Sequence, residues 1–275
     1  MNADLHCHST ASDGLLAPRD VVARAAANGV DLFSLTDHDD TSGLEEARAE
    51  ARERGIRFVE GVEISVTWHG STVHIVGLRI DPRSAALREG LESIRRGRAT
   101  RARKIADGLA AAGIPGSLAG AQRYAENPEL ISRAHFARYL VEAGRAPDVK
   151  NVFQRYLVQD KPGWVPHQWA ALQDAIGWIR ASGGVAIVAH PGRYKYAKSE
   201  MREFFGEFRD CGGAGIEVVT GSHAPEQYFE FARSAREFGL LASRGSDYHG
   251  KGESRADLGT LPPLPDDLKP VWHDW

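Results

Sequence analysis

Short apolar runs alternate with amphipathic stretches along most of this chain of 275 residues, and this alternation restricts the folds open to it. The apolar runs have the length of strands, and the amphipathic stretches repeat their apolar residues at helical spacing. Strands are expected at 3–8, 31–36, 57–65, 72–80, 184–189, 215–219 and 240–243, and helices at 18–28, 43–54, 172–182, 199–211 and 225–238. Strands separated by helices usually run parallel with helical crossovers, so the sequence predicts an α/β barrel of the (β/α) type.

The segment between residues 85 and 159 differs from the rest because it has little strand signal. Helices are expected at 94–112, 118–125, 132–143 and 149–157. Gly113 and Gly144 follow two of these helices, as glycine often does where a helix ends. The sequence therefore predicts a small helical insertion domain at 98–157 within a barrel built from 1–97 and 158–275.

Charge and cysteine content narrow the cellular setting. The formal net charge is −3, so no overall positive field draws the protein to nucleic acid or to a membrane. The two cysteines argue against a disulfide framework, and the N-terminal residues do not have the pattern of a signal peptide. No apolar run approaches the roughly 18 residues of a spanning helix. We expect a cytoplasmic protein with no membrane association, and no obligate protein partner is evident.

Histidine and acidic residues recur in or just after most of the expected strands. His6 and His8 are two residues apart in the first strand, so their side chains point to the same side, and Asp4 could orient one imidazole. The other residues of this kind are Asp13, His38, Glu63, His74, Asp247 and His249. Functional residues of such barrels gather at the C-terminal strand ends, so we expect these side chains to form a metal cluster.

The chemistry of this set points to phosphoester hydrolysis. Mixed imidazole and carboxylate ligands suit Mn²⁺, Fe²⁺ or Zn²⁺. Neighbouring metals can activate water at neutral pH and clamp phosphate oxygens during in-line displacement. The chain shows neither a serine triad nor a Gly-rich loop that would cradle phosphate.

Several other residues are candidates for work on a substrate. Arg133 and Arg193 are candidates for phosphate recognition, because a guanidinium fork matches phosphate oxygens, although structural salt bridges are the alternative for both. His190 follows the strand at 184–189 and is a candidate for protonating the leaving oxygen or supporting a ligand, with structural packing as the alternative. His167 and His223 are weaker candidates of the same kind.

Two features of the expected insertion remain open. His135 would more often be a packed helix histidine, but Arg133 two positions earlier makes an anion-facing role plausible. A basic stretch at the start of the insertion could touch an RNA backbone, although such stretches are more often solvated helix faces. Its members are Arg95, Arg96, Arg98, Arg101, Arg103 and Lys104.

Four motifs together resemble the polymerase and histidinol phosphatase (PHP) superfamily of phosphoesterases. They are Asp4-Leu5-His6-Cys7-His8, Thr36-Asp37-His38-Asp39, Gly61-Val62-Glu63-Ile64 and Ser246-Asp247-Tyr248-His249, in the order that this superfamily has. Further segments are similar to a subgroup of nucleoside 3′,5′-bisphosphate phosphatases, some of which also trim short RNA from the 5′ end. These segments are Asn127-Pro128-Glu129, Ser132–Arg138, Lys161-Pro162-Gly163 and Ala189–Tyr194.

The resemblance implies a distorted (β/α)7 barrel that binds up to three divalent metals, with Mn²⁺ favoured. One metal would take His6, His8, Glu63 and Asp247, and a second would take Glu63, His74 and His135. A third would take Asp13, His38 and His249. The resemblance also adds Lys161 to the substrate-binding candidates.

The expected activity is hydrolysis of the 3′-phosphate of a nucleoside 3′,5′-bisphosphate to a nucleoside 5′-monophosphate and phosphate. The partner would be this small nucleotide and, in a related reaction, short RNA trimmed from its 5′ end. Three alternatives remain: a histidinol-phosphate type of phosphatase, an exonuclease acting mainly on RNA, and a non-catalytic nucleic-acid-binding PHP module.

Overall fold

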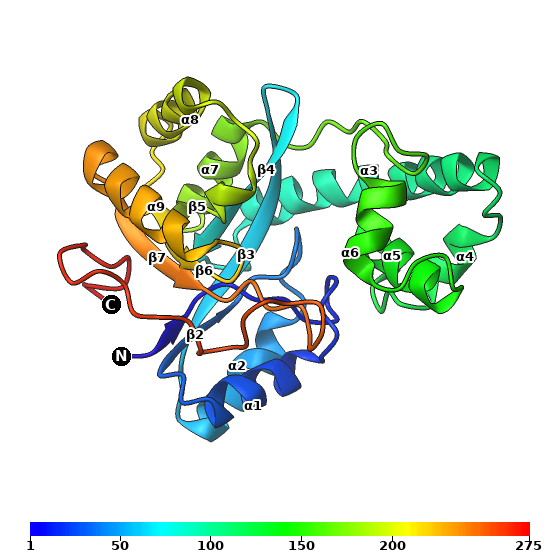
Figure 1. Cartoon of the computed structure of the whole chain (residues 1–275). Coiled ribbons are helices and arrows are strands. Elements are labelled where there is room, and N and C mark those ends of the chain that lie inside the picture. Colours follow the sequence, from blue (N-terminus) through cyan, green and yellow to red (C-terminus); the bar gives the residue numbers. More distant parts are fainter.

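Seven strands form one curved sheet in which the spatial order of the strands is their order along the chain (Figure 1). The computed structural model describes all residues from Met1 to Trp275. The strands are β1 (Ala3–Asp4), β2 (Leu32–Leu35), β3 (Arg57–Trp68), β4 (Ser71–Leu78), β5 (Val185–Val188), β6 (Gly215–Thr220) and β7 (Leu241–Gly245).

The first and last strands close this sheet into a nearly complete barrel. The Leu5 amide donates to the Arg244 carbonyl at 3.0 Å, and the His8 amide donates to the Tyr248 carbonyl at 2.9 Å. A side chain at Gly245 would place its Cβ 2.3 Å from the Cβ of His6, so only glycine permits this approach. The expectation of a distorted seven-stranded barrel is confirmed.

The distortion is the direction of β4, which runs antiparallel to both β3 and β5. The other neighbouring strands pair in parallel. A two-residue connection at His69-Gly70, with positive φ at both residues, reverses the chain between β3 and β4. So short a connection leaves no room for a crossover helix, and β4 therefore runs against the direction of its neighbours.

Helices pack against the outside of the barrel, and a large apolar core lies between them and the strands. The covering helices are α1 (Pro18–Ala27), α2 (Leu44–Arg54), α7 (Leu172–Ala181), α8 (Lys198–Asp210) and α9 (Pro225–Phe238). In Figure 1, α1 and α2 lie together on one side of the sheet and α7, α8 and α9 on the other. No helix combines the length and the apolar character that crossing a lipid bilayer requires.

A helical insertion projects from the barrel at the end of the long helix α3 (Ala85–Ala111), as Figure 1 shows. Its other elements are α4 (Ser117–Gln122), the 3₁₀ turn η1 (Pro128–Leu130), α5 (Arg133–Glu142), α6 (Val149–Val152) and the π turn η2 (Phe153–Leu157). These elements enclose an apolar cluster of their own that contains Leu109, Phe136 and Leu140. The boundary predicted at residue 98 falls inside the continuous α3, so this division of the chain stays a prediction.

Candidate active site

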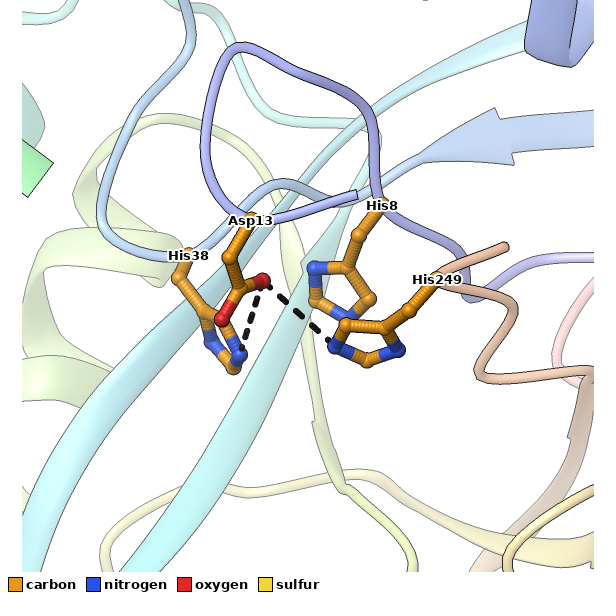
Figure 2. A group of neighbouring side chains, drawn as sticks. All are labelled: His8, Asp13, His38 and His249. Carbon is orange, nitrogen blue, oxygen red and sulfur yellow. Dashed lines mark ion pairs between the residues drawn. The ribbon is translucent and has the colours of Figure 1, made fainter. Parts of the chain in front are cut away.

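The histidines and carboxylates expected to meet do converge at one end of the barrel. Figure 2 shows four of them, with Asp13 between His38 and His249 and with His8 beside them. The His38 and His249 Nε2 atoms lie 3.8 and 3.5 Å from Asp13 Oδ1. Glu63 lies deeper, with His74 Nδ1 at 2.9 Å from its Oε1.

Four overlapping groups have possible ligand atoms within 4.8 Å of one another. They are His8, Asp13, His38 and His249; His6, His190 and Asp247; His6, His8 and Glu63; and His38, Glu63 and His74. Every residue of the expected ligand set except His135 belongs to at least one group, and His190 is the addition. The site is therefore a single cluster that shares ligands rather than a set of separate sites.

Unpartnered buried atoms show that this cluster fits cations. Oδ1 of Asp13, Oδ1 of Asp247 and Oε2 of Glu63 are buried without a hydrogen-bond partner. His38 Nδ1 lies 2.8 Å from Glu63 Oε2, yet neither atom has a hydrogen-bond partner. A buried polar group left unpaired costs about 1–3 kcal/mol, and a divalent metal bound between such atoms would remove that cost.

The protonation states of Glu63, His8 and His190 suit metal binding, which needs ionised carboxylates and neutral imidazoles. Burial lowers the pKa of His6 and of His38, but neighbouring carboxylates outweigh burial, raise the pKa of His6 and bring that of His38 to about 9, so these two rings would give up a proton to a bound metal. Burial raises the pKa of Glu63, but His74, His38 and the other imidazoles around it outweigh burial and hold that pKa well below its usual range. Burial lowers the pKa of His8 to about 3 and that of His190 to about 3. Both rings are thus neutral near pH 7 and offer a lone pair.

Glu217, which the sequence pattern did not single out, contacts two of the histidines through its carboxylate. Its Oε1 lies 2.8 Å from His6 Nδ1, and its Oε2 accepts a hydrogen bond from the His190 amide at 2.6 Å. This contact makes Nδ1 the donor of His6, so the ring presents Nε2 to the cluster. A carboxylate inside the apolar run of β6 was the available signal, because such a residue is rarely buried without a partner.

Two further carboxylates shape the loops of the site. Asp37 accepts hydrogen bonds from the Ser9 amide at 2.8 Å and the Ser12 hydroxyl at 2.5 Å, which holds the loop that carries Asp13. Asp4 accepts from the Ser246 amide at 2.8 Å and thereby fixes the loop that carries Asp247. The expectation that Asp4 orients an imidazole is wrong, because both of its oxygens accept backbone amides.

Strained backbone marks the same region. Asp39, His190 and Asp247 have φ values of 52°, 28° and 53°, in the left-handed region that side chains rarely adopt. Each such residue costs about 1–3 kcal/mol and persists only where its surroundings enforce it. In Asp247 the amide donates to the His6 carbonyl at 2.8 Å, which is one such enforcing contact.

His190 and His135 take different places from those expected. His190 Nε2 lies 2.8 Å from Glu63 Oε1, on the inner side of the cluster. His135 is buried in the first turn of α5, where its Nδ1 accepts the Ser132 amide at 3.1 Å. The structure thus brings His190 rather than His135 beside Glu63, and a ligand role for His135 stays a prediction.

The candidate substrate residues divide into those that line the cavity over the cluster and those that do not. This cavity has a volume of about 360 Å³, and both Arg133 and Arg193 line it. Arg193 Nη1 also lies 3.2 Å from Asp247 Oδ2. Lys161, His167 and His223 are not among the lining residues, so their contact with substrate stays a prediction.

The three residues outside the cavity have other surroundings. Lys161 is exposed, and His167 packs edge-on against Trp169 with ring centres 4.1 Å apart. His223 is buried, stacks on Phe231 and accepts the Gly192 amide at 3.0 Å through Nε2. Its position supports the turn that carries Arg193.

The fold and the ligand cluster together define a class, the metal-dependent hydrolases built on an α/β barrel. A family model described as the PHP domain matches residues 4–221, and this chain belongs to that family. The chain is 51% identical over 273 residues to a 3′,5′-nucleoside bisphosphate phosphatase of Chromobacterium violaceum, covering 99% of this chain and 96% of the relative. It is 40% identical to the 5′-3′ exoribonuclease Rnm of Escherichia coli, covering 99% of this chain and 93% of that protein.

Solved structures agree with this placement. An amidohydrolase structure from Chromobacterium violaceum superimposes with a TM-score of 0.96 at 51% identity, covering 99% of this chain and 95% of the other. A Bifidobacterium adolescentis structure whose name proposes a metal-dependent phosphoesterase gives a TM-score of 0.84 at 26% identity, covering 98% and 93%. The barrel and its insertion are thus shared over nearly the full length.

Proposed function

We propose that this protein hydrolyses the 3′-phosphate of nucleoside 3′,5′-bisphosphates to nucleoside 5′-monophosphate and phosphate. The observation that carries the proposal is a cavity with a cation-binding cluster on one side and arginines above it. The relative from Chromobacterium violaceum, with 51% identity over nearly the whole chain, supports the choice of substrate. We retain the cytoplasm as the expected compartment.

We assign three metal positions within this cluster, starting from those that the resemblance to the PHP superfamily implied. His6, His8, Glu63 and Asp247 would hold the first, and Asp13, His38 and His249 the third. For the second we assign His190 in place of His135, together with Glu63 and His74, because His190 Nε2 and His74 Nδ1 lie 2.8 and 2.9 Å from the same Glu63 oxygen. His190 also groups with His6 and Asp247, so it lies between the first and second positions. We favour Mn²⁺, with Fe²⁺ and Zn²⁺ as alternatives.

Bound metals would supply an activated water at neutral pH and neutralise charge on the phosphate oxygens. The residues of the chain then hold and orient the substrate. Arg193 reaches the cavity from the barrel, where its guanidinium can bind an oxygen of the phosphate under attack. Burial lowers the pKa of His190 to about 3, so the ring is a neutral imidazole near pH 7 and suits a ligand better than a general acid.

Removal of nucleotides from the 5′ end of short RNA is a second candidate, supported by the 40% identity to the Escherichia coli exoribonuclease. Both reactions break the bond between phosphorus and the 3′-oxygen of a nucleotide, so one site can perform both. The arrangement also leaves histidinol phosphate to be tested as a rival substrate.

A substrate panel on Mn²⁺-loaded protein tests the proposal. It compares adenosine 3′,5′-bisphosphate, histidinol phosphate and a short 5′-phosphorylated RNA by release of phosphate or nucleotide. We expect the bisphosphate to have the highest kcat/KM. A higher value for the RNA would make the exoribonuclease reaction the main one, and turnover of histidinol phosphate alone would overturn both.

A further inference from the structure

Two arginines of α3 face the same indole ring. Arg98 and Arg101 place their guanidinium carbons 4.8 and 5.1 Å from the ring centre of Trp169. They are three residues apart, which puts them on one face of the helix. Both are buried, with 4% and 8% of their surface exposed, and both line the cavity over the metal cluster. The basic stretch that contains them is therefore not a solvated face at these two positions.

The two arginines differ in how their charge is balanced. Arg98 forms an ion pair with the buried carboxylate of Asp39 and donates to the Ser65 hydroxyl at 3.2 Å. Arg101 forms no ion pair and no hydrogen bond, and its Nε is buried without a partner. Burial lowers the pKa of Arg101 to about 9, and the like charges of Arg133 and Arg98 add to that effect. A buried cation without a partner is costly, so this residue needs an anion that the chain does not supply.

Arg133 adds a second unbalanced charge on the same side of the cavity. It is the first residue of α5, and its guanidinium lies 5.6 Å from the ring centre of Phe153. Its hydrogen bond is a long one, to the Leu157 carbonyl at 3.5 Å, and no carboxylate pairs with it. The positive end of the α5 dipole lies beside it.

The acidic residues that line the cavity do not neutralise these two cations. Asp13 and Asp247 belong to the metal cluster, and Glu253 is engaged by Arg138 through two contacts of 2.8 Å. Arg193 belongs to the barrel and lies beside Asp247. The cavity thus has a cation-binding side on the barrel and an anion-binding side on the insertion.

We propose that Arg101, together with Arg133, binds the phosphate of the substrate that is not hydrolysed, and that Arg101 thereby determines specificity for a doubly phosphorylated nucleoside. The inference rests on the proposed function and extends it. With the 3′-phosphate at the metals, the 5′-phosphate remains to be placed, and a guanidinium fork is suited to it. In trimming RNA, the terminal 5′-phosphate would occupy the same place.

Two substrates that differ only in this phosphate test the assignment. Adenosine 3′,5′-bisphosphate and adenosine 3′-monophosphate are compared on Mn²⁺-loaded wild type and on Arg101→Met, which keeps an unbranched apolar stem and removes the guanidinium. We expect kcat/KM for the bisphosphate to fall about 10- to 100-fold, as loss of charged hydrogen bonds predicts, with less than about threefold change for the monophosphate. Equal losses on both substrates, or no loss on the bisphosphate, would overturn the assignment.

Two further variants serve as controls. Arg103→Met removes an exposed arginine two residues along α3 and should leave both substrates unchanged. Arg101→Lys keeps the charge without the fork and should recover part of the loss. Thermal unfolding of each variant checks the fold, and Arg101→Met should melt at or above the wild-type temperature, because it removes an unpaired buried charge.

Product binding separates this inference from the proposed function. Titration calorimetry with adenosine 5′-monophosphate should show about 10- to 100-fold weaker binding to Arg101→Met, whereas inhibition by inorganic phosphate should not change. If the wild type hydrolyses neither adenosine substrate, the proposed function fails and this titration alone decides on the subsite. Unchanged binding of the monophosphate would then reject it.

Discussion

Charged side chains lie beside groups of opposite charge on one side of the cavity, and two arginines lack such partners on the other. On the barrel side, carboxylates and imidazoles are interleaved, and even the cation Arg193 lies beside Asp247. On the insertion side, Arg101 and Arg133 have no carboxylate partner. The difference indicates what each side can bind: the barrel side has unpartnered carboxylate oxygens for metal cations, and the insertion side has guanidinium groups for an anion.

Polar contacts fix the insertion relative to the barrel, so the two sides of the cavity keep their positions. Arg138 of α5 donates to the carbonyl of Asp13 at 2.5 Å and also engages Glu253. Asn127 donates to Asp40 at 2.8 Å. The insertion is thus tied to the loops that carry Asp13 and His38, which holds the two sides of the cavity at one spacing.

Removal of metal should have the largest effect on activity, because it leaves the carboxylates and imidazoles of the barrel side without cations. Protein stripped with a chelator should lose at least about 10³-fold in kcat on the bisphosphate, because bound metals contribute several kcal/mol to the transition state. Added Mn²⁺ should restore activity and raise the melting temperature of the stripped protein. Full activity in metal-free protein would refute the cluster as a metal site.

Arg98→Met should destabilise the protein where Arg101→Met does not. Loss of Arg98 leaves Asp39, whose side chain is fully buried, without its cation, and breaking such a pair costs about 3–5 kcal/mol. Urea unfolding of both variants measures the difference. Equal destabilisation would mean that Arg101 has a stabilising partner after all.

Glu217→Gln should have the smallest of the three effects, a loss of metal affinity that involves only the barrel side of the cavity. The amide would still contact His6 but would no longer supply the negative charge that favours its tautomer, so metal affinity should fall about 10- to 100-fold. Metal titration measures this, with Glu226→Gln at an exposed position of α9 as the matched control. An unchanged affinity would show that Glu217 serves packing only.

Much of the barrel side could be predicted from the sequence, because its ligands come directly at strand ends. His6 and His8, His38, and Asp247 with His249 all stand next to recognisable strands, and the barrel brings these ends together. His190 has the same position after β5, but the sequence His190-Pro191 was as consistent with structural packing as with a role at the site. Glu217 was hidden in an apolar strand, where spacing alone does not show which way a lone carboxylate faces.

The sequence by itself determined the alternation of strands and helices and the chemical type of the ligands, since both depend on short-range pattern. Only the tertiary structure decided the antiparallel pairing of β4 with β5, the place of His190 beside Glu63, and the difference between two arginines on one helix face. Arg98 finds its carboxylate 59 positions away along the chain, and Arg101 finds none. Charge balance in a buried site depends on which residues are neighbours in the folded protein, and the local sequence pattern does not show this.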